Sequence, residues 1–526
     1  MSKKNIFLKI TKGKPDKVAE GLKEFYDLCE NMSEFPILNG LNLRLDVWKT
    51  LLWYLSNDIY SSLHLQCLRT LRVLSRDKTD LDNILTLPNL TFLLTIANLF
   101  KENKQKFVYE PEVIFEGQKL LCNILFNSPK VQVMIGKPDY LRCLIERIEN
   151  PIESFTQEMR LFDIRILFLV TAFNEYSRRF VKNEFKGDVC LAKILEDISS
   201  QYNSSPIKED DVNLACEILK TLFNVYIHVE DPSEKVTEKF KNLVSILRKL
   251  ILCQCEIKKE ELHSNIVNLL TEVPPESYSN LLQPVESDNC THVYENTDMS
   301  VIKVLLQLLD IKLEYKLDLI ENITPVLSCL IKLVKSERLM RKFMRLEILP
   351  PLKDVMKRPE EGNTTKAKLC QLLTSPITEI RDLVAEFLFI LCKENVDRMI
   401  KYTGYGNAAG MFANKGLLGH PQPKTDYSSE SEDSETEEYS KYKEQINPVT
   451  GCYEKPKPNP LEGMSEEQKE YEVMQLIGLV DKLTREGVVQ PCRIGEDGKP
   501  VPIEHVLELQ NNLPKQQTTC DTSDSD

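Results

Sequence analysis

Three glycines, Gly404, Gly406 and Gly410, form the segment whose spacing comes nearest to a chemical motif. They resemble the fingerprint that holds a dinucleotide pyrophosphate. That fingerprint needs a preceding strand and a βαβ unit, whereas a helical pattern precedes these glycines. No phosphate-binding loop, zinc-protease motif, nucleophile elbow or supported carboxylate pair occurs elsewhere. We therefore predict no nucleotide binding at these glycines, and no enzyme activity.

The cysteines offer no convincing metal site. The closest pair, Cys253 and Cys255, has neither a second pair nor a histidine at ligand spacing, and the chain has six histidines in all. The fifteen cysteines are scattered singly, mostly inside apolar helical stretches. We predict reduced core thiols, no disulfide framework, no metal and no cofactor.

Two arginines could bind an acidic group. Arg72 and Arg76 are four residues apart on one predicted helix, so both guanidinium groups can face one carboxylate, for instance the terminal carboxylate of a peptide. The alternative is a solvated helix face, which the spacing alone does not exclude.

Asparagines recur within similar apolar helices, at Asn123, Asn224 and Asn268. A side-chain amide offers two donors and an acceptor, so a ladder of asparagines can hydrogen-bond a peptide lying in the groove of a helical-repeat protein. Phe162 and Phe223 lie on two of the helices expected to line that groove, where they could anchor an apolar helix of a partner. The alternatives are exposed polar residues for the asparagines and ordinary core packing for the phenylalanines.

An acidic block at residues 426–439 carries two candidate phosphorylation sites, Ser429 and Ser434. Each has a glutamate three residues further on, the spacing that an acidophilic casein-kinase-type kinase recognises. Phosphorylation adds up to about two negative charges per site, which a basic cluster could bind. The alternative is an acidic solubilising linker. The cluster that we expect to dock the phosphates comprises Arg341, Lys342 and Arg345.

The elements that would position these residues are helices. From about residue 15 to 420 apolar residues recur with a period of 3.6, separated by short polar or proline breaks, with almost no alternating strand pattern. One example is 375–395, with Ser375 as expected cap and Pro376 at the first helical position. We predict an all-α protein, an irregular armadillo/HEAT-like superhelical solenoid over residues 1–420.

The composition changes near residue 420, where prolines and acidic residues accumulate. We predict an acidic, proline-rich linker at 421–463, an amphipathic helix at 464–487, and a mostly disordered tail at 488–526. The helix opens with a capping box and stops at a glycine. It is expected either to pack on the solenoid or to act as a partner-binding arm. The residues proposed for its binding face are Met474, Ile477, Val480 and Leu483.

The overall composition is that of a globular protein, with 42% hydrophobic and 28% charged residues. A formal charge of −13 makes nucleic acid a poor partner. The N-terminus has no apolar run of signal-peptide length, and no stretch approaches the roughly 18 apolar residues of a membrane span. We expect a cytoplasmic protein without a transmembrane segment.

Several blocks together resemble one family over nearly the whole chain and in the same order. The chain is identified on these blocks as similar to synembryn, the family named for resistance to inhibitors of cholinesterase, in its A-like form. The blocks are LRVLSRD (71–77), ILPPLKDVMKRPEEG (348–362), VAEFLFILCKENVDRMIKYTGYGNAAGMFANKGLL (384–418), INPVTG (446–451) and PNPLEGMSEEQKEYEVMQLIGLVDKL (458–483).

This resemblance implies a chaperone and receptor-independent guanine nucleotide exchange factor for heterotrimeric G-protein α (Gα) subunits. It implies a groove that holds the C-terminal helix of Gα, an arm that reaches its switch region, and activating phosphorylation at Ser429 and Ser434. The groove candidates that it supports are Arg72, Arg76, Asn123, Phe162, Phe223 and Asn268. One position departs from the family pattern, where Ile227 stands in place of a further aromatic residue.

The partners implied are Gα subunits of the i, q and twelve/thirteen classes, with the s class less certain. A neuronal calcium-sensor protein and an acidophilic casein-kinase-type kinase are further candidates, and peripheral recruitment to the cell cortex or plasma membrane is expected. The main alternative is a general armadillo-type scaffold that binds extended peptides and has no effect on nucleotide exchange.

Overall fold

The computed structural model describes residues 3–100, 109–202, 205–227, 234–285, 291–418, 436–455, 461–495 and 497–503. The chain divides into two compact units, residues 1–304 and 305–526. Helices dominate both units, and the described strands are only two or three residues long. The predicted all-α class is confirmed, with three very small sheets added.

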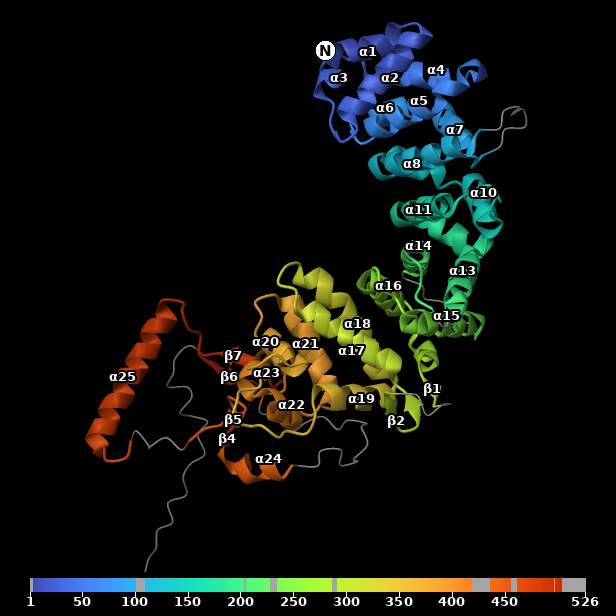
Figure 1. Ribbon diagram of the computed structural model, residues 1–526. Helices are drawn as coiled ribbons and strands as arrows, with labels where there is room; N and C mark the ends of the chain where they lie inside the picture. The colour runs from blue at the N-terminus through green and yellow to red at the C-terminus, as the bar shows by residue number, and fades with distance from the viewer. Residues whose placement is uncertain are drawn as a thin grey trace, which may run out of the picture. The chain divides into compact units, whose positions relative to one another are not determined.

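The first unit is a stack of helices in two layers (Figure 1). The inner layer is a series in which each helix packs against the next, in the order α2, α5, α8, α11, α14 and α16. Its helices are α2 (Pro15–Cys29), α5 (Ser61–Leu74), α8 (Pro111–Asn127), α11 (Gln157–Phe173), α14 (Glu209–Tyr226) and α16 (Lys259–Thr271).

The second layer packs on the first: α4 contacts α5, α7 contacts α8, α10 contacts α11, α13 contacts α14, and α15 contacts α16. Its helices are α1 (Lys3–Lys12), α4 (Arg44–Leu55), α7 (Leu87–Ile96), α10 (Pro138–Glu149), α13 (Gly187–Gln201) and α15 (Glu234–Leu252). Short segments join the layers: α3 (Pro36–Gly40), η1 (Asp58–Tyr60), α6 (Leu81–Ile84), α9 (Pro129–Ile135), α12 (Glu175–Arg179), the π-helical turn η2 (Phe180–Glu184) and η3 (Pro275–Leu281). This repeated pairing is the armadillo/HEAT-like arrangement expected from the sequence.

Local sequence explains where many of these helices begin. Proline occupies the first helical position of α2, α8, α9 and α10, where its missing N–H costs nothing. The side chains of Ser128, Thr156 and Asn174 accept hydrogen bonds that cap α9, α11 and α12. Each inner helix buries an apolar face against its neighbours; α14 alone buries eleven residues.

A small antiparallel sheet follows η3, with strand order β1 (Gln283–Pro284), β3 (Thr297–Asp298), β2 (Val293–Tyr294). Asp298 at its end pairs with Arg248 of α15. Helix α17 (Ser300–Leu313) spans the boundary between the two units.

The second unit centres on α21, which packs against α18, α19, α20, α22 and α23. These helices are α18 (Leu319–Ser336), α19 (Arg338–Ile348), α20 (Thr365–Leu372), α21 (Thr378–Leu391), α22 (Val396–Thr403) and α23 (Tyr405–Lys415). The start predicted for α21 is wrong: the helix begins at Thr378, and the hydroxyl of Ser375 accepts from the N–H of Ile377 in the preceding turn instead of capping the helix.

Segments after residue 435 return to α23. They form α24 (Glu437–Tyr442), the turn η4 (Lys443–Gln445) and two hairpins, one of β4 (Ile446–Asn447) with β5 (Cys452–Tyr453), the other of β6 (Cys492–Ile494) with β7 (Pro500–Pro502). The N–H groups of Tyr405 and Gly406 donate to Pro448 and Val449 at 2.8 and 2.9 Å. Leu418 N–H donates to Gly498 at 3.2 Å. Part of the predicted linker is therefore ordered; the domain boundaries drawn from composition stay a prediction.

This return explains the glycine-rich stretch. Gly404 has φ +76°, a conformation that favours glycine, and a Cβ there would lie 3.1 Å from the carbonyl oxygen of Val449. The glycine is needed where the β4–β5 hairpin crosses the start of α23.

Helix α25 (Glu466–Arg485) lies between the two hairpins in sequence. Its predicted capping box is confirmed, since Ser465 and Gln468 bond each other's backbone N–H groups at 3.2 and 3.1 Å. Gly487, at φ +71°, follows its end, and no residue of α25 is buried. The acidic block around Ser429 and Ser434, and the predicted disordered tail beyond residue 503, lie outside the described residues.

Candidate partner-binding face

Half-buried aromatic, basic and amide side chains line one side of the inner-layer helices, and contacts link them from helix to helix. We call this set the stacked-helix face. It consists of Arg72 on α5, Phe115, Lys119 and Asn123 on α8, Phe162, Arg165 and Phe168 on α11, and Lys220, Phe223 and Asn224 on α14. Four of the six residues predicted for the groove belong to it.

The two arginines predicted to act together are held differently. Arg72 lies on α5, and its Nε donates to the carboxylate of Glu116 on α8. The prediction that Arg76 shares this helix is wrong: α5 ends at Leu74, and the guanidinium of Arg76 donates to the carbonyl oxygens of Glu30 and Met32. Arg76 therefore lies beside the end of α2.

The asparagines tie neighbouring inner helices together. Asn123 Nδ2 donates to the Arg72 carbonyl at 3.0 Å, and Asn224 Nδ2 donates to the Phe168 carbonyl at 3.3 Å. Asn127 repeats the pattern with Ser75 at 2.9 Å. Asn268 is half-buried on α16, the next helix of the stack. Asn123 and Asn127 therefore bind carbonyls at the end of α5, and Asn224 joins α14 to the body of α11, in addition to any role toward a partner.

Aromatic rings on the face pack against one another and against cations. The rings of Phe115 and Phe162 meet edge to face at 5.3 Å between centroids. Lys119 Nζ lies 3.7 Å from the centre of the Phe115 ring, and Arg165 lies 5.0 Å from that of Phe162. Phe223, one helical turn beyond Lys220, is half-buried. These rings are neither fully in the core nor fully in solvent, as expected of aromatic anchors for a partner.

A polar cavity of about 520 Å³ lies beside Arg76. Asp77 in its wall is only 6% exposed and pairs with Arg44 at 3.2 Å. Burial acts to raise the pKa of Asp77, but hydrogen bonds from Thr79, Asn39 and Phe35 outweigh it and lower the pKa to about 2. The cavity is lined by Ser33, Glu34, Phe35, Pro36, Asn39, Arg76, Asp77, Lys78 and Thr79.

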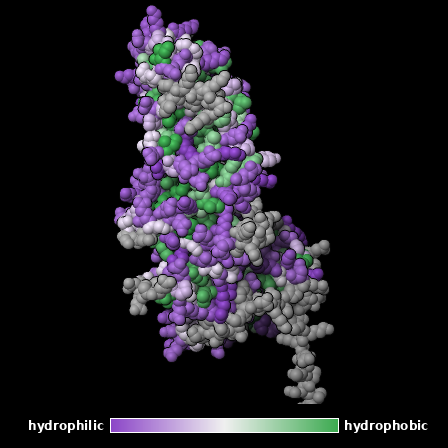
Figure 2. Space-filling view, turned by 90° about the vertical axis from the view of Figure 1, so that its right-hand side faces the viewer, coloured by the Kyte–Doolittle hydropathy of each residue, from purple (hydrophilic) through white to green (hydrophobic). Residues whose placement is uncertain are grey.

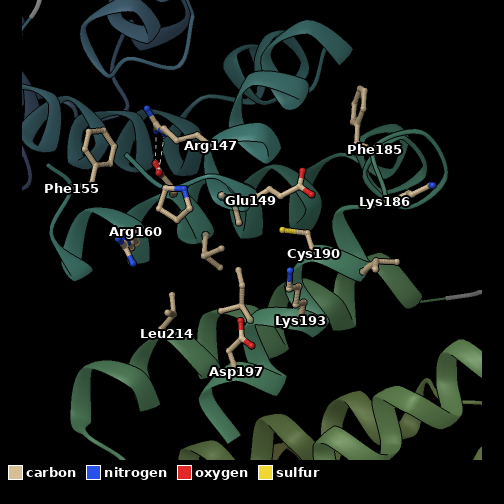
Figure 3. A pocket seen from close by; sticks show the side chains of 16 residues that line it. Arg147, Glu149, Phe155, Arg160, Phe185, Lys186, Cys190, Lys193, Asp197 and Leu214 are labelled. Atoms are coloured by element: carbon tan, nitrogen blue, oxygen red, sulfur yellow. Dashed lines mark hydrogen bonds and ion pairs between the residues drawn. The ribbon is translucent and has the colours of Figure 1, made fainter. Parts of the chain in front are cut away.

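A second cavity, of about 550 Å³, lies between α10, α11 and α13 (Figure 3). In its wall Arg147 forms a buried pair with Asp163, and Cys190 and Lys193 of α13 line the opposite side. Burial raises the pKa of the Cys190 thiol to about 11, so this cysteine is not an activated nucleophile. No residue of this cavity was singled out from the sequence.

Figure 2 shows one side of the molecule, on which hydrophobic patches interrupt a mostly hydrophilic surface.

On α25 the residues predicted for the arm differ in exposure: Met474 is 69% exposed, whereas Ile477, Val480 and Leu483 are half-buried. Further exposed apolar side chains on this helix are Tyr471, Val473, Leu476 and Leu479.

The predicted phosphate-docking residues lie on α19. Arg345 is buried, and Arg341 Nη1 donates to the Val334 carbonyl at 2.8 Å. Lys342 is half-buried. Because the acidic block lies outside the described residues, docking of a phosphorylated segment stays a prediction.

Sequence reasoning missed the acidic residues that organise the stacked-helix face. Glu116 and Glu217 are 4% and 6% exposed, and each binds two cations. A signal was present: in both α8 and α14 the order is glutamate, lysine three residues later and asparagine seven residues later. Comparing the asparagine-containing helices position by position would have found it.

The described ranges were searched for metal-binding groups and for membrane-spanning helices. Within them no group of three or more His, Cys, Asp or Glu residues could hold a metal ion. No helix there is long and apolar enough to cross a membrane. None of the thirteen cysteines of these ranges forms a disulfide.

Comparison with known proteins gives consistent matches. The family model described as guanine nucleotide exchange factor synembryn matches residues 67–499. The protein named chaperone Ric-8A of Xenopus tropicalis is 38% identical over 493 residues, which cover 90% of each chain. The protein named chaperone Ric-8 of Drosophila melanogaster is 34% identical over 556 residues, covering 95% of this chain and 96% of the relative.

Proposed function

The chain belongs to the synembryn family of guanine nucleotide exchange factors, and we propose that it acts as a folding chaperone and receptor-independent exchange factor for heterotrimeric G-protein α subunits. The observation that carries the proposal is the family match over residues 67–499, which includes the stacked-helix face from Arg72 to Asn224. We assign the binding of the Gα C-terminal helix to this face, to Arg76 at its end and to Asn268 on α16.

Exchange on this account needs no covalent chemistry. A protein that binds nucleotide-free Gα more tightly than Gα-GDP must weaken GDP binding by the same factor, because the two binding equilibria are linked. A hundredfold preference corresponds to about 2.7 kcal/mol. Contacts between the stacked-helix face and the C-terminal helix of Gα would supply this difference in binding free energy, provided that they form fully only when the helix has left the core of Gα. GTP then binds, restores the helix to Gα and weakens the complex.

Chaperone activity follows from the same contacts. A nascent Gα subunit exposes apolar helical surface before it folds, and such surface promotes aggregation. Half-buried rings such as Phe162 and Phe223 offer a preformed apolar surface that can cover it. One surface would thus serve both activities.

Helix α25 suits the role of an arm. It is twenty residues long, none of them buried, and it carries exposed apolar side chains such as Met474 and Leu479. The hairpins on both sides of it in sequence hydrogen-bond to segments that flank α23, Pro448 and Val449 at its start and Gly498 just after its end. We propose that α25 contacts the switch region of Gα through Met474, Ile477, Val480 and Leu483.

Regulation and recruitment complete the proposal. We assign phosphorylation of Ser429 and Ser434 by an acidophilic casein-kinase-type kinase, and docking of the phosphates on Arg341, Lys342 and Arg345. The basic side chains of α19 supply the charge for that contact. Binding of Gα subunits at the membrane would bring the protein to the cell cortex, and a calcium-sensor protein would compete for the same face.

The test is the rate of GDP release from purified Gα subunits of the i, q, s and twelve/thirteen classes. We expect at least tenfold faster release with the full chain and loss of most of that gain with Arg72→Ala. Arg179→Ala is the matched control, because the Arg179 side chain is 71% exposed and, within the part of the chain that the structure describes, forms an ion pair with the exposed Glu175 four residues away. Tight binding with unchanged release would favour the scaffold alternative, and no binding to any Gα class would refute the proposal.

A further inference from the structure

Two buried glutamates organise cations on the stacked-helix face in the same way. Glu116 of α8 binds Arg72 from the preceding inner helix and Lys119 from its own, the latter at 3.9 Å. Glu217 of α14 binds Arg165 from the preceding inner helix at 2.9 Å and Lys220 from its own at 3.0 Å. The arrangement therefore repeats two inner helices further along the stack.

Aromatic rings connect the two clusters. Lys119 lies against Phe115 and, at 6.0 Å, near Phe162. Arg165 lies 5.0 Å from the centre of the same Phe162 ring, and Lys220 lies 5.3 Å from the centre of the Phe168 ring. We call the seven residues the cation–aromatic strip: Arg72, Phe115, Lys119, Phe162, Arg165, Phe168 and Lys220.

The strip is positive although the chain as a whole carries −13. In each cluster two cations face one carboxylate, which leaves one net positive charge per cluster and two over the strip. The cations stay accessible, since their side chains are 20%, 31%, 37% and 31% exposed for Arg72, Lys119, Arg165 and Lys220. The glutamates and rings restrict these long side chains before a partner arrives, which lowers the entropy lost on binding.

We propose that the cation–aromatic strip recognises acidic side chains on the apolar face of a partner helix, with Glu116 and Glu217 as positioning residues. The rings contact the apolar side chains, and each cluster accepts one carboxylate between its two cations. The proposal rests on the proposed function, in which that helix is the C-terminal helix of Gα, and adds the feature by which the helix is selected.

The geometry sets the spacing of the acidic residues. Corresponding cations lie on α8 and α14, two helix-to-helix steps apart, or about 16–20 Å at 8–10 Å per packed pair. A helix that runs along the stack rises 1.5 Å per residue, so its two acidic positions are about 11–13 residues, or three turns, apart. A partner with one acidic position uses one cluster and binds more weakly.

The test measures binding of synthetic peptides with the sequence of a Gα C-terminal helix to the full chain by fluorescence anisotropy. One peptide keeps its acidic residues, a second has the matching amides, and a third has lysines there. We expect the amide peptide to bind about tenfold more weakly at low salt than the acidic peptide, with a smaller salt dependence.

Charge reversal on the protein gives the complementary test. Lys220→Glu should weaken binding of the acidic peptide about tenfold and strengthen binding of the lysine peptide, while Lys193→Glu on α13 should change neither affinity more than twofold.

Glu217→Gln tests positioning. We expect it to reduce the discrimination between acidic and amide peptides to below about threefold, whereas a purely structural role would weaken both peptides equally and contradict the assignment. Lys119→Gln and Lys220→Gln serve as milder variants if the charge reversals fail to fold. Equal affinity for the acidic and amide peptides, with GDP release still accelerated, would overturn the strip and leave the proposed function standing. Absence of peptide binding together with unchanged GDP release would overturn both.

Discussion

Replacing Arg147 by methionine should destabilise the middle of the first unit more than the replacement of any exposed residue. The Arg147 and Asp163 side chains are 5% and 4% exposed. Arg147 donates from Nε to Asp163 at 2.9 Å and from Nη1 to the carbonyls of Ala97 and Asn98 at 2.7 and 2.8 Å, so it joins α10, α11 and the end of α7 (Figure 3 shows the ion pair). Methionine fills similar volume but leaves a buried carboxylate and two carbonyls without these donors.

The expected cost is about 3–5 kcal/mol, the range for removing one partner of a buried ion pair. At about 1.36 kcal/mol per tenfold change, amide protection in α10 and α11 should fall by roughly two to three and a half orders of magnitude. The assay is hydrogen exchange with mass spectrometry on the full chain, supported by urea unfolding. Arg147→Met/Asp163→Leu is the informative control, because removing both charges should cost less than removing Arg147 alone.

The pH dependence of the stability lost in Arg147→Met gives a further check on this explanation. Without Arg147 the buried Asp163 carboxyl has its pKa raised above the unfolded value, so its stabilising protonated form predominates at low pH and is lost as the pH rises through the folded pKa. The deficit of Arg147→Met relative to the wild type should therefore shrink as the pH falls toward 4. A deficit below about 1 kcal/mol, or one that is the same at every pH, would refute this reasoning.

Three other predictions concern separate parts of the chain. Asn123→Ala removes the 3.0 Å bond to the Arg72 carbonyl and should cost about 1 kcal/mol in urea unfolding. Burial, with a smaller effect of Lys259, lowers the pKa of His263 to about 4. The wild type should therefore lose about 3 kcal/mol of stability as the pH falls from 6.5 to 4, because the unfolded chain takes up the proton first. His263→Leu should abolish this loss, which acid titrations followed by circular dichroism would measure. Leu479→Ser on α25 should leave the unfolding midpoint within about 0.5 kcal/mol of wild type but slow Gα GDP release, and a large change in stability would show that α25 packs elsewhere.

Short-range patterns made much of the fold predictable from sequence. The period of 3.6 marks the helices because each inner helix must bury an apolar face against its neighbours. The capping box of Ser465 and Gln468 marked the start of α25 because both of its hydrogen bonds are local. At α21 the same kind of argument failed by two residues, since Ser375 forms a local turn with Ile377 that competes with capping.

The ion pairs could not be predicted because they join residues far apart in sequence. Arg72 and Glu116 are 44 residues apart, and Arg165 and Glu217 are 52 apart. Sequence patterns assign charged residues to solvent, whereas Glu116 and Glu217 are buried and each pairs with a cation of the preceding inner helix. Likewise, nothing local to Gly404 indicates that a hairpin some 45 residues later approaches its Cα. The ion pairs of the two glutamates and the requirement for glycine at position 404 both depend on tertiary contacts.

The most direct test of the account is where the C-terminal helix of Gα lies on this chain. A photo-crosslinking amino acid in place of Phe162, on the stacked-helix face, is compared with the same amino acid in place of Phe185, which lines the cavity beside α13. The account predicts that cross-linked peptides at position 162 come from the Gα C-terminal helix and decrease when GTP is added, with none at position 185. Cross-links of that helix to position 185 and none to position 162 would contradict it.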